Sequence, residues 1–221
     1  MKKLILLLFL GCSSFFVSAQ KCSQIDFDEI YKKNNDKKSP FFFAKLLERY
    51  QALDTTMTPE EYKHLYYGYT RSTFYSPLGT ETTPLTRLVE DGKIKEAKES
   101  IKLLDKTNPI NLNLAYSKAL LAFKEKDEAK TKIYTHQMKG LFQTILKSGD
   151  GKSAEKAFVV TAIEDEYFLM KIFKLQFLKQ EKISACDVIT IGLPNTFNIE
   201  KLYFNIEKSS EYIENMFKDK K

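Results

Sequence analysis

Few residues of this chain have the types and spacing that chemistry requires. The stretch GDGKS at 149–153 ends like a phosphate-binding loop of the pattern G-x-x-x-x-G-K-[ST], which wraps phosphates in backbone amides. The position five residues before Gly151 is Leu146, so the first glycine is missing. A phosphate-binding loop also follows a strand and opens a helix, whereas the patterns here predict the reverse order. We therefore interpret the stretch as a turn in which Gly149 caps a helix and Gly151 takes a positive φ.

A histidine provides a second candidate for chemistry. His64 lies close in sequence to Glu60 and Glu61, and together with Ser72 or Tyr67 it could act as a general base in a hydrolase. The alternative, which we favour, is an exposed histidine on a helix. The sequence therefore does not predict a catalytic site here.

Acidic residues in the C-terminal part of the chain provide a third candidate. Asp165 and Glu166 precede Tyr167, and a pair of carboxylates can act on a glycosidic bond. Acids in the first turn of a helix equally stabilise its N-terminus. Asp187 falls on an apolar strand pattern, where a carboxylate needs a partner. We expect that partner to form a structural hydrogen bond or ion pair.

The remaining cysteines and histidines predict neither a metal site nor a cofactor. A zinc site requires three or four clustered ligands, and the chain has only His64 and His136 as histidines, without cysteines nearby. Cys22 and Cys186 either form a disulfide, in a compartment where disulfides persist, or remain two thiols with Cys186 buried.

A tyrosine-rich segment is the strongest candidate for binding. Tyr66, Tyr67, Tyr69, Arg71 and Tyr75 combine aromatic and arginine side chains, which are enriched at interface hot spots. Helical spacing places Tyr66 and Tyr69 on a core-facing stripe and Tyr67 away from it. The segment either binds an envelope protein or peptide, or packs the helices together. Exposure of Tyr67 and Tyr75 would favour binding.

The N-terminal residues predict export. Lys2 and Lys3 precede an apolar stretch that ends in the small residues Val17-Ser18-Ala19, which is typical of a signal peptide cleaved after Ala19. The alternative is a lipoprotein anchored to a membrane through Cys12. We expect a periplasmic or secreted protein without a transmembrane segment, because no stretch reaches the roughly 20 apolar residues of a bilayer span.

The charge of the chain argues against binding to nucleic acid. The net charge is +6, and removal of Lys2 and Lys3 leaves 33 basic against 29 acidic residues, a net charge of +4. These charges are spread along the chain, whereas nucleic-acid binders gather theirs into a stripe or patch.

The part from 20 to 148 reads as helical. Ser39-Pro40 predicts the start of one helix, and Thr58 with Glu61 forms the capping-box pattern at the start of another. The segment 83–146 has the pattern of paired helices, and its DGKIKEA turn is similar to that of tetratricopeptide-type hairpins.

The part from 149 to 221 reads as sheet-containing. Strand-forming residues are concentrated at 158–162, 186–191 and 202–206, with a helix around Phe168 and a terminal helix around Tyr212. We expect an α+β fold in which helical hairpins pack on a three-stranded, mainly antiparallel sheet. The mature chain, 20–221, should be a single domain after a signal peptide at 1–19.

Several segments carry a resemblance to a known family. These are DTTMTPEEYKHLYYGYT, FYSPLG, SGDGKSAEKAFVV with the following EDEY, CDVITI and LYFNIEKSSEYI. They resemble a domain-of-unknown-function family of secreted Gram-negative bacterial proteins of comparable length. Leu78 departs from the pattern, which has a second aromatic after Ser76-Pro77. The resemblance implies fold and export, and transfers no catalytic residue.

These patterns together favour an exported, non-catalytic protein that serves as a binding or structural module of the cell envelope. The alternative is a hydrolase-type envelope enzyme with an acidic or His64-based site.

Overall fold

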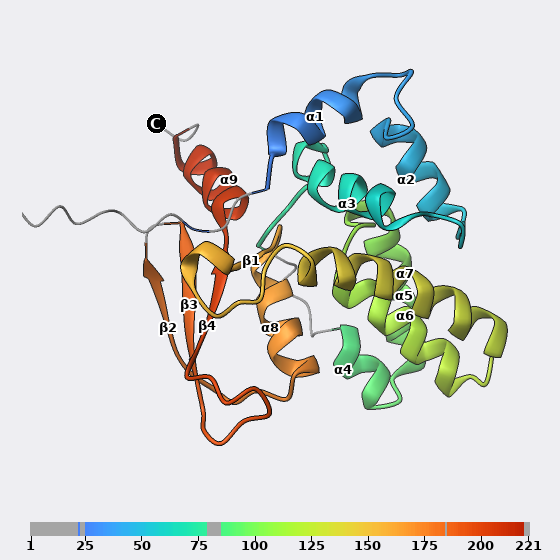
Figure 1. Cartoon of the computed structure of the whole chain (residues 1–221). Helices are drawn as coiled ribbons and strands as arrows, with labels where there is room; N and C mark the ends of the chain where they lie inside the picture. The colour runs from blue at the N-terminus through green and yellow to red at the C-terminus, as the bar shows by residue number, and fades with distance from the viewer. Residues whose placement is uncertain (1–21, 23–24, 79–84, 184, 219–221) are drawn as a thin grey trace, which may run out of the picture.

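The structure, a computed structural model, describes residues 22, 25–78, 85–183 and 185–218. The expected signal peptide at 1–19 and the alternative anchor Cys12 lie outside these residues, as does position 83, where the paired helices were expected to begin. Within them, helices come first and a sheet with two further helices follows (Figure 1). The fold is α+β, as the sequence predicted.

Nine α-helices are present among the described residues. They are α1 (Phe27–Asn35), α2 (Phe43–Gln51), α3 (Pro59–Gly68), α4 (Leu85–Glu90), α5 (Ile94–Thr107), α6 (Leu112–Lys124), α7 (Glu128–Leu146), α8 (Ile163–Ile172) and α9 (Glu207–Lys218). None of these described helices is long and apolar enough to cross a membrane.

The sheet has four strands, so the expected number of three was wrong. They are β1 (Phe158–Val159), β2 (Phe177–Ile183), β3 (Cys186–Ile191) and β4 (Lys201–Asn205), in the order β1-β4-β3-β2. β1 pairs with β4 in parallel, and the other neighbours are antiparallel. The sequence did not reveal β2 because its side chains are exposed or half-buried at the sheet edge, and therefore lack an apolar alternation.

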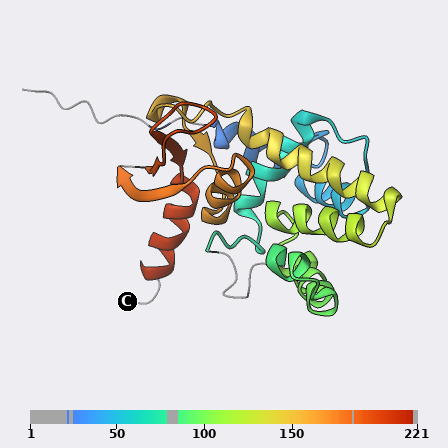
Figure 2. The same ribbon diagram turned by 90° about the horizontal axis from the view of Figure 1, so that it is seen from below.

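One hydrophobic core joins the helical and sheet-containing parts. Leu46, Tyr66 and Leu141 of the helices belong to the same buried cluster as Phe168 of α8 and Phe204 of β4. The sheet and α9 lie at one end of the molecule and helices α4 to α7 at the other (Figures 1 and 2). Helix α8 lies between them and packs on α6.

Two helix starts test the capping patterns. At α3 the Thr58 hydroxyl accepts from the Glu61 amide at 3.2 Å, and the Glu61 carboxylate accepts from the Thr58 amide at 2.7 Å. The predicted capping box is therefore confirmed. Helix α2 begins at Phe43 instead of Pro40, because the Ser39 hydroxyl accepts from the Phe41 amide at 3.0 Å and holds a turn before the helix.

Helices α4 with α5 and α6 with α7 pack as neighbours in the order of the chain. Gly92 turns α4 into α5 with a φ of +75°. The expected tetratricopeptide-like arrangement of these helices is not confirmed.

The GDGKS stretch forms a turn between α7 and β1. The amides of Asp150 and Gly151 both donate to the Lys156 carbonyl, at 2.9 and 2.8 Å. Gly151 has the predicted positive φ, +69°. Gly149 does not act as the expected cap, because α7 already ends at Leu146. Instead, a Cβ at Gly149 would lie 2.3 Å from the Lys156 carbonyl oxygen, so only glycine fits this close approach.

Candidate functional site

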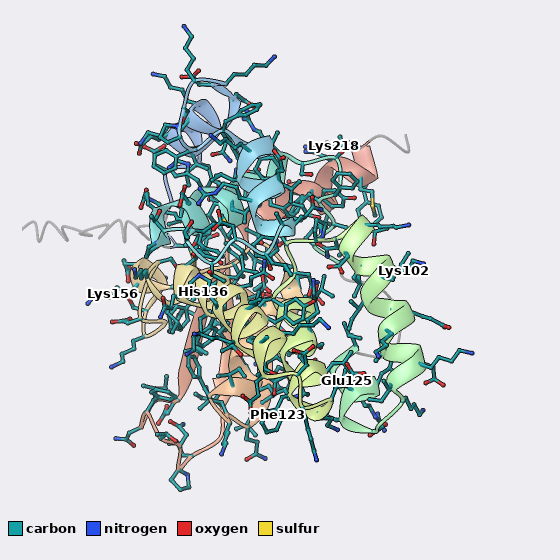
Figure 3. All side chains as sticks on the ribbon, turned by 90° about the vertical axis from the view of Figure 1, so that its right-hand side faces the viewer. Lys102, Phe123, Glu125, His136, Lys156 and Lys218 are labelled. Carbon is teal, nitrogen blue, oxygen red and sulfur yellow. A yellow bond between two sulfur atoms is a disulfide. The ribbon has the colours of Figure 1, made fainter. Side chains whose placement is uncertain are left out.

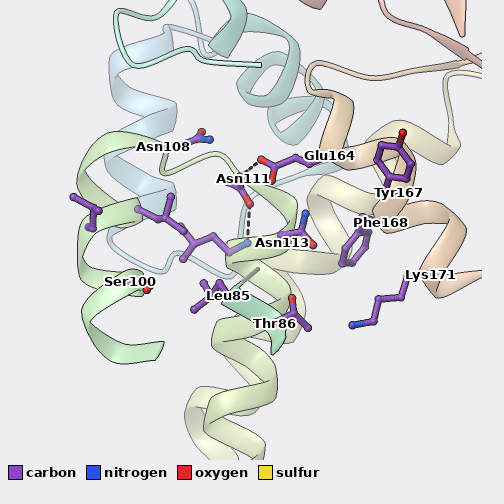
Figure 4. Close-up of a pocket in the computed structure, with 13 residues that line it drawn as sticks. Leu85, Thr86, Ser100, Asn108, Asn111, Asn113, Glu164, Tyr167, Phe168 and Lys171 are labelled. Atoms are coloured by element: carbon purple, nitrogen blue, oxygen red, sulfur yellow. Dashed lines mark hydrogen bonds between the residues drawn. The ribbon is translucent and has the colours of Figure 1, made fainter. Parts of the chain in front are cut away.

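A cavity of about 300 Å³ lies between helices α4, α5, α6 and α8 (Figure 4). Such a volume is at the lower end of the range for small-ligand sites. The wall contains apolar side chains from all four helices, namely Leu85, Leu103, Leu104, Leu114 and Phe168. The polar residues at the cavity are Thr86, Ser100, Asn108, Asn111, Asn113, Glu164, Tyr167 and Lys171. A ligand would therefore meet an apolar wall and a set of hydrogen-bonding groups.

The link between α5 and α6 positions the asparagines. Asn108-Pro109 follows the end of α5, because the proline cannot continue the helix. Asn111 caps α6, and its side-chain oxygen accepts from the Leu114 amide at 2.8 Å. The amide nitrogen of Asn111 donates to Glu164, as Figure 4 shows. One side chain thus starts α6 and reaches across to α8.

Glu164 brings a carboxyl group to this cavity from the first turn of α8. Burial raises its pKa, and hydrogen bonds from Asn111 and Asn113 act in the opposite direction. The carboxyl group is therefore held by two side-chain amides beside an apolar wall. Such a group can accept hydrogen bonds from the N–H groups of a ligand.

Lys171 supplies the cation among the residues of the cavity. Its ammonium nitrogen lies 2.8 Å from a carboxylate oxygen of Glu90, and its side chain is 48% exposed. Exposed ion pairs of this kind contribute little stability, so Lys171 can exchange its partner at small cost. The hydroxyl of Tyr167, a residue that is 45% exposed, donates to the side-chain oxygen of Gln180 at 2.6 Å.

The next acid of α8, Asp165, points into the protein interior. Tyr66 donates from its hydroxyl to Asp165 at 2.6 Å, and the same hydroxyl accepts from the Thr161 amide at 3.0 Å. Burial raises the pKa of Asp165 to about 7, and the bond from Tyr66 acts against this. Asp165 is only 3% exposed, and its hydrogen bond with Tyr66 joins α8 to α3.

The third acid, Glu166, faces the sheet. Gln180 of β2 donates to Asp187 at 2.7 Å and to Glu166 at 3.3 Å, so one amide bridges two buried carboxyl groups. Burial, together with the nearby charges of Asp187 and Asp165, raises the pKa of Glu166 to about 9. Burial also raises the pKa of Asp187, and the hydrogen bond from Gln180 acts in the opposite direction. The partner that Asp187 was expected to need is therefore Gln180.

The tyrosines predicted to form a binding surface are buried. The exposed fractions are 0% for Tyr66, 1% for Tyr67, 2% for Tyr69 and 8% for Tyr75. Arg71 is exposed, and its guanidinium carbon lies 3.9 Å from the centre of the Tyr31 ring. The four tyrosines pack the core, so the predicted exposure of Tyr67 was wrong, and Tyr75 lacks the exposure that would have favoured binding.

The environment of α3 explains this burial. Helices α1, α2 and α7 pack around α3, which leaves it without an exposed side for Tyr67. The hydroxyl of Tyr67 donates to the Val159 carbonyl at 3.2 Å, and that of Tyr75 donates to the Thr161 carbonyl at 2.6 Å. Buried tyrosines keep such partners because an unpaired hydroxyl is costly.

His64 is buried and structural, so its expected exposure was also wrong. It is 1% exposed, and its Nδ1 lies 3.0 Å from the side-chain oxygen of Asn34. Its ring stacks on Phe41 with the ring centres 4.1 Å apart. Burial lowers the pKa of His64, which favours the neutral ring. The contacts with Asn34 and Phe41 hold the ring in place.

The two cysteines that the structure describes are joined. Cys22 and Cys186 form a disulfide, with Cα atoms 5.8 Å apart, that ties the start of the described chain to β3. Of the two alternatives that the sequence left open, a disulfide or two thiols, the structure contains the disulfide. Among the described residues, no group of three or more acids, histidines or cysteines is placed to hold a metal ion.

The sequence did not single out Glu164, Asn111 and Asn113. Asn111 carried a local signal, since an asparagine directly before an apolar helical pattern is a strong cap. Its partner Glu164 lies 53 positions further along the chain, so no local pattern joins the two residues.

Comparison with known proteins places the chain in a family. No curated protein and no solved structure matches it. A family model described as a domain of unknown function, DUF4919, matches residues 28–215. That range includes α8, the tyrosine-rich segment and most of the sheet-containing part. The chain therefore belongs to the DUF4919 family.

Proposed function

We propose that the protein is a non-catalytic binding module of the cell envelope, which holds a short peptide segment in the cavity between α4, α5, α6 and α8. The observation that carries this proposal is the pairing of an apolar wall with Glu164, Asn111 and Asn113. The proposed binding site is therefore this cavity and not the tyrosine-rich segment, whose tyrosines are buried.

The chemistry of the lining fits a peptide. Leu103, Leu104 and Leu114 suit an aliphatic side chain, which gains about 25 cal/mol for each square ångström of apolar surface removed from water. Asparagine side chains carry a donor and an acceptor, as peptide groups do. Lys171 at the cavity suits a carboxylate, such as the C-terminus of a peptide. The volume of about 300 Å³ restricts the ligand to a short segment.

The placement of the acids supports binding over hydrolysis. Hydrolysis of a glycosidic bond uses two carboxyl groups on either side of the bond. Among the described residues that line this cavity, Glu164 is the sole acid. Asp165 and Glu166 are 3% and 0% exposed and are engaged with Tyr66 and Gln180, so a substrate would not reach them.

Two observations support export. The N-terminal sequence has the features of a signal peptide cleaved after Ala19, and the Cys22–Cys186 disulfide is typical of compartments outside the cytoplasm. We expect the intact mass of protein recovered from the periplasm or medium to correspond to a chain beginning at Gln20. A diacylated terminus at Cys12 would instead show a lipoprotein.

The binding proposal is tested with dipeptides and a variant that fills the cavity. Calorimetry should detect binding of Leu-Leu, weaker binding of its C-terminal amide and none of Lys-Lys. Ser100→Phe places a large apolar side chain at the cavity without removing Glu164 or the asparagines, and should abolish binding of Leu-Leu.

Lys102→Phe is the matched control, because it adds the same side chain at an exposed position of the same helix. It should bind Leu-Leu like the unmodified protein. Equal binding by the two phenylalanine variants, or no binding of Leu-Leu by the unmodified protein, would refute the proposal.

A further inference from the structure

We propose that a second cavity, between α3 and α7, binds small molecules through an oxyanion group, either a carboxylate or a phosphate. This cavity has a volume of about 250 Å³ and shares no lining residue with the cavity at α8. Its wall includes Met57, Tyr62, His136, Lys139 and Lys147. It therefore forms a site separate from the proposed peptide cavity.

Two buried polar atoms at this cavity lack partners. Within the described part of the chain, the hydroxyl oxygen of Tyr62 and Nε2 of His136 have no hydrogen-bond partner, although both atoms are buried. Tyr62 is only 2% exposed. A buried polar group without a partner destabilises the fold, so most such groups in folded proteins are satisfied. A ligand in the cavity would supply the partner for both atoms.

The charge of the cavity selects an anion. Lys139 and Lys147 line it, and no aspartate or glutamate does so among the described residues. Neither lysine has an ion pair in the part of the chain that the structure describes. Burial raises the pKa of Tyr62, so its hydroxyl stays protonated and can donate. Hydrogen bonds from such donors to an anionic oxygen are stronger than bonds between neutral groups.

The local sequence of α7 explains how these groups meet. His136, Lys139, Gly140 and Gln143 recur at intervals of three and four residues and therefore share one side of the helix, on which Figure 3 labels His136. Their common side borders the cavity. Lys147 follows directly after the helix and lines the same cavity.

Gly140 allows the tyrosine to approach this side of α7. A Cβ at Gly140 would lie 2.4 Å from the Cζ and Cε1 atoms of Tyr62, closer than any real contact. A residue without a side chain is therefore needed for the Tyr62 ring to pack against the helix. Met57 and Pro59 add apolar surface beside it, which suits a ligand with a small apolar part.

The test is a titration with inorganic phosphate and, separately, with acetate, at constant ionic strength set by chloride. Chemical shifts of the His136 ring report binding. We expect a saturable shift with at least one of the two anions, and a rise of at least tenfold in the dissociation constant for Tyr62→Phe and for Lys147→Gln. The anion that binds identifies phosphate or carboxylate as the recognised group.

Two controls separate this site from general effects of salt. Phosphate stabilises folded proteins by exclusion from their surface, so a rise in melting temperature alone is not informative. Lys102→Gln, at an exposed position outside the cavity, should bind like the unmodified protein. Tyr62→Phe removes a hydroxyl without a partner, so it should fold with undiminished stability when no anion is present.

The proposal would be overturned by the absence of a saturable shift with both anions, or by equal dissociation constants for the unmodified protein and Tyr62→Phe. Ser100→Phe, which fills the peptide cavity, should leave anion binding unchanged. A failure of the peptide proposal would therefore leave this result intact, and the converse also holds.

Discussion

Replacing Glu166 with Gln should make the stability of the protein less dependent on pH. Glu166 is completely buried, and its pKa in the folded protein is about 9 against an ordinary value of 4.5. Between these two values the folded state holds a proton that the unfolded state has lost. The free energy of unfolding therefore falls as pH rises through this window, and the contribution is complete below it.

The magnitude follows from the width of the window. One pH unit within it corresponds to about 1.36 kcal/mol, so an increase from pH 5 to pH 8 should remove up to about 4 kcal/mol of stability through Glu166 alone. Glutamine has nearly the same shape and cannot ionise. Glu166→Gln should therefore abolish this part of the loss, whereas Asp165, with a pKa of about 7, still contributes a loss of the same sign.

Urea denaturation followed by circular dichroism at pH 5 and pH 8 measures the effect. The difference in stability between the two pH values should be smaller for Glu166→Gln than for the unmodified protein. Glu214→Gln, a change at an exposed position of α9, should leave the difference unchanged. If Glu166→Gln lowers stability equally at both pH values, Glu166 is ionised in the folded protein and the reasoning is refuted.

Other changes test the packing around α3 and the disulfide. Tyr66→Phe leaves a buried carboxyl group and an amide without their partner, so urea denaturation should show a loss of about 1–3 kcal/mol. Tyr67→Ala should cost about 3–5 kcal/mol in the same assay, and a loss under 1 kcal/mol would contradict its burial. Gly140→Ala improves helix propensity by about 1 kcal/mol but overpacks the ring beside it by about 1–3 kcal/mol, so calorimetry should show a lower melting temperature. Replacing Cys22 and Cys186 together with Ser opens a loop of 164 residues, and should lower the free energy of unfolding by up to about 5 kcal/mol in the chain-entropy account. An unchanged midpoint after reduction with dithiothreitol would contradict this last expectation.

Local patterns predicted most of the secondary structure. The capping box at Thr58 and Glu61 acts through neighbours three positions apart, and it starts α3 as expected. The alternation at 186–191 also gave a strand in the expected place, and of the strand-forming residues at 158–162 only Phe158–Val159 form one. Such elements can be predicted from sequence because residues within one turn or one pleat determine them.

Local patterns did not predict the edge strand β2 or the burial of α3 on several sides. β2 becomes a strand through its pairing with β3, and its exposed side chains at the sheet edge give no apolar alternation. Tyr67 was expected outside the core because helical spacing assumes one buried side. That assumption fails for α3, because other helices pack on several of its sides, and only the tertiary structure shows this packing.

The candidate site divides in the same manner. The sequence by itself determined that Asp187 needs a partner and that acids gather in the first turn of α8. The tertiary structure alone decided that Glu164 borders a cavity while the next two acids face the core and the sheet. Consecutive helical residues point about 100° apart, so neighbours in sequence enter different surroundings. Those surroundings consist of segments distant in the chain, and local residue types do not encode which of them will meet.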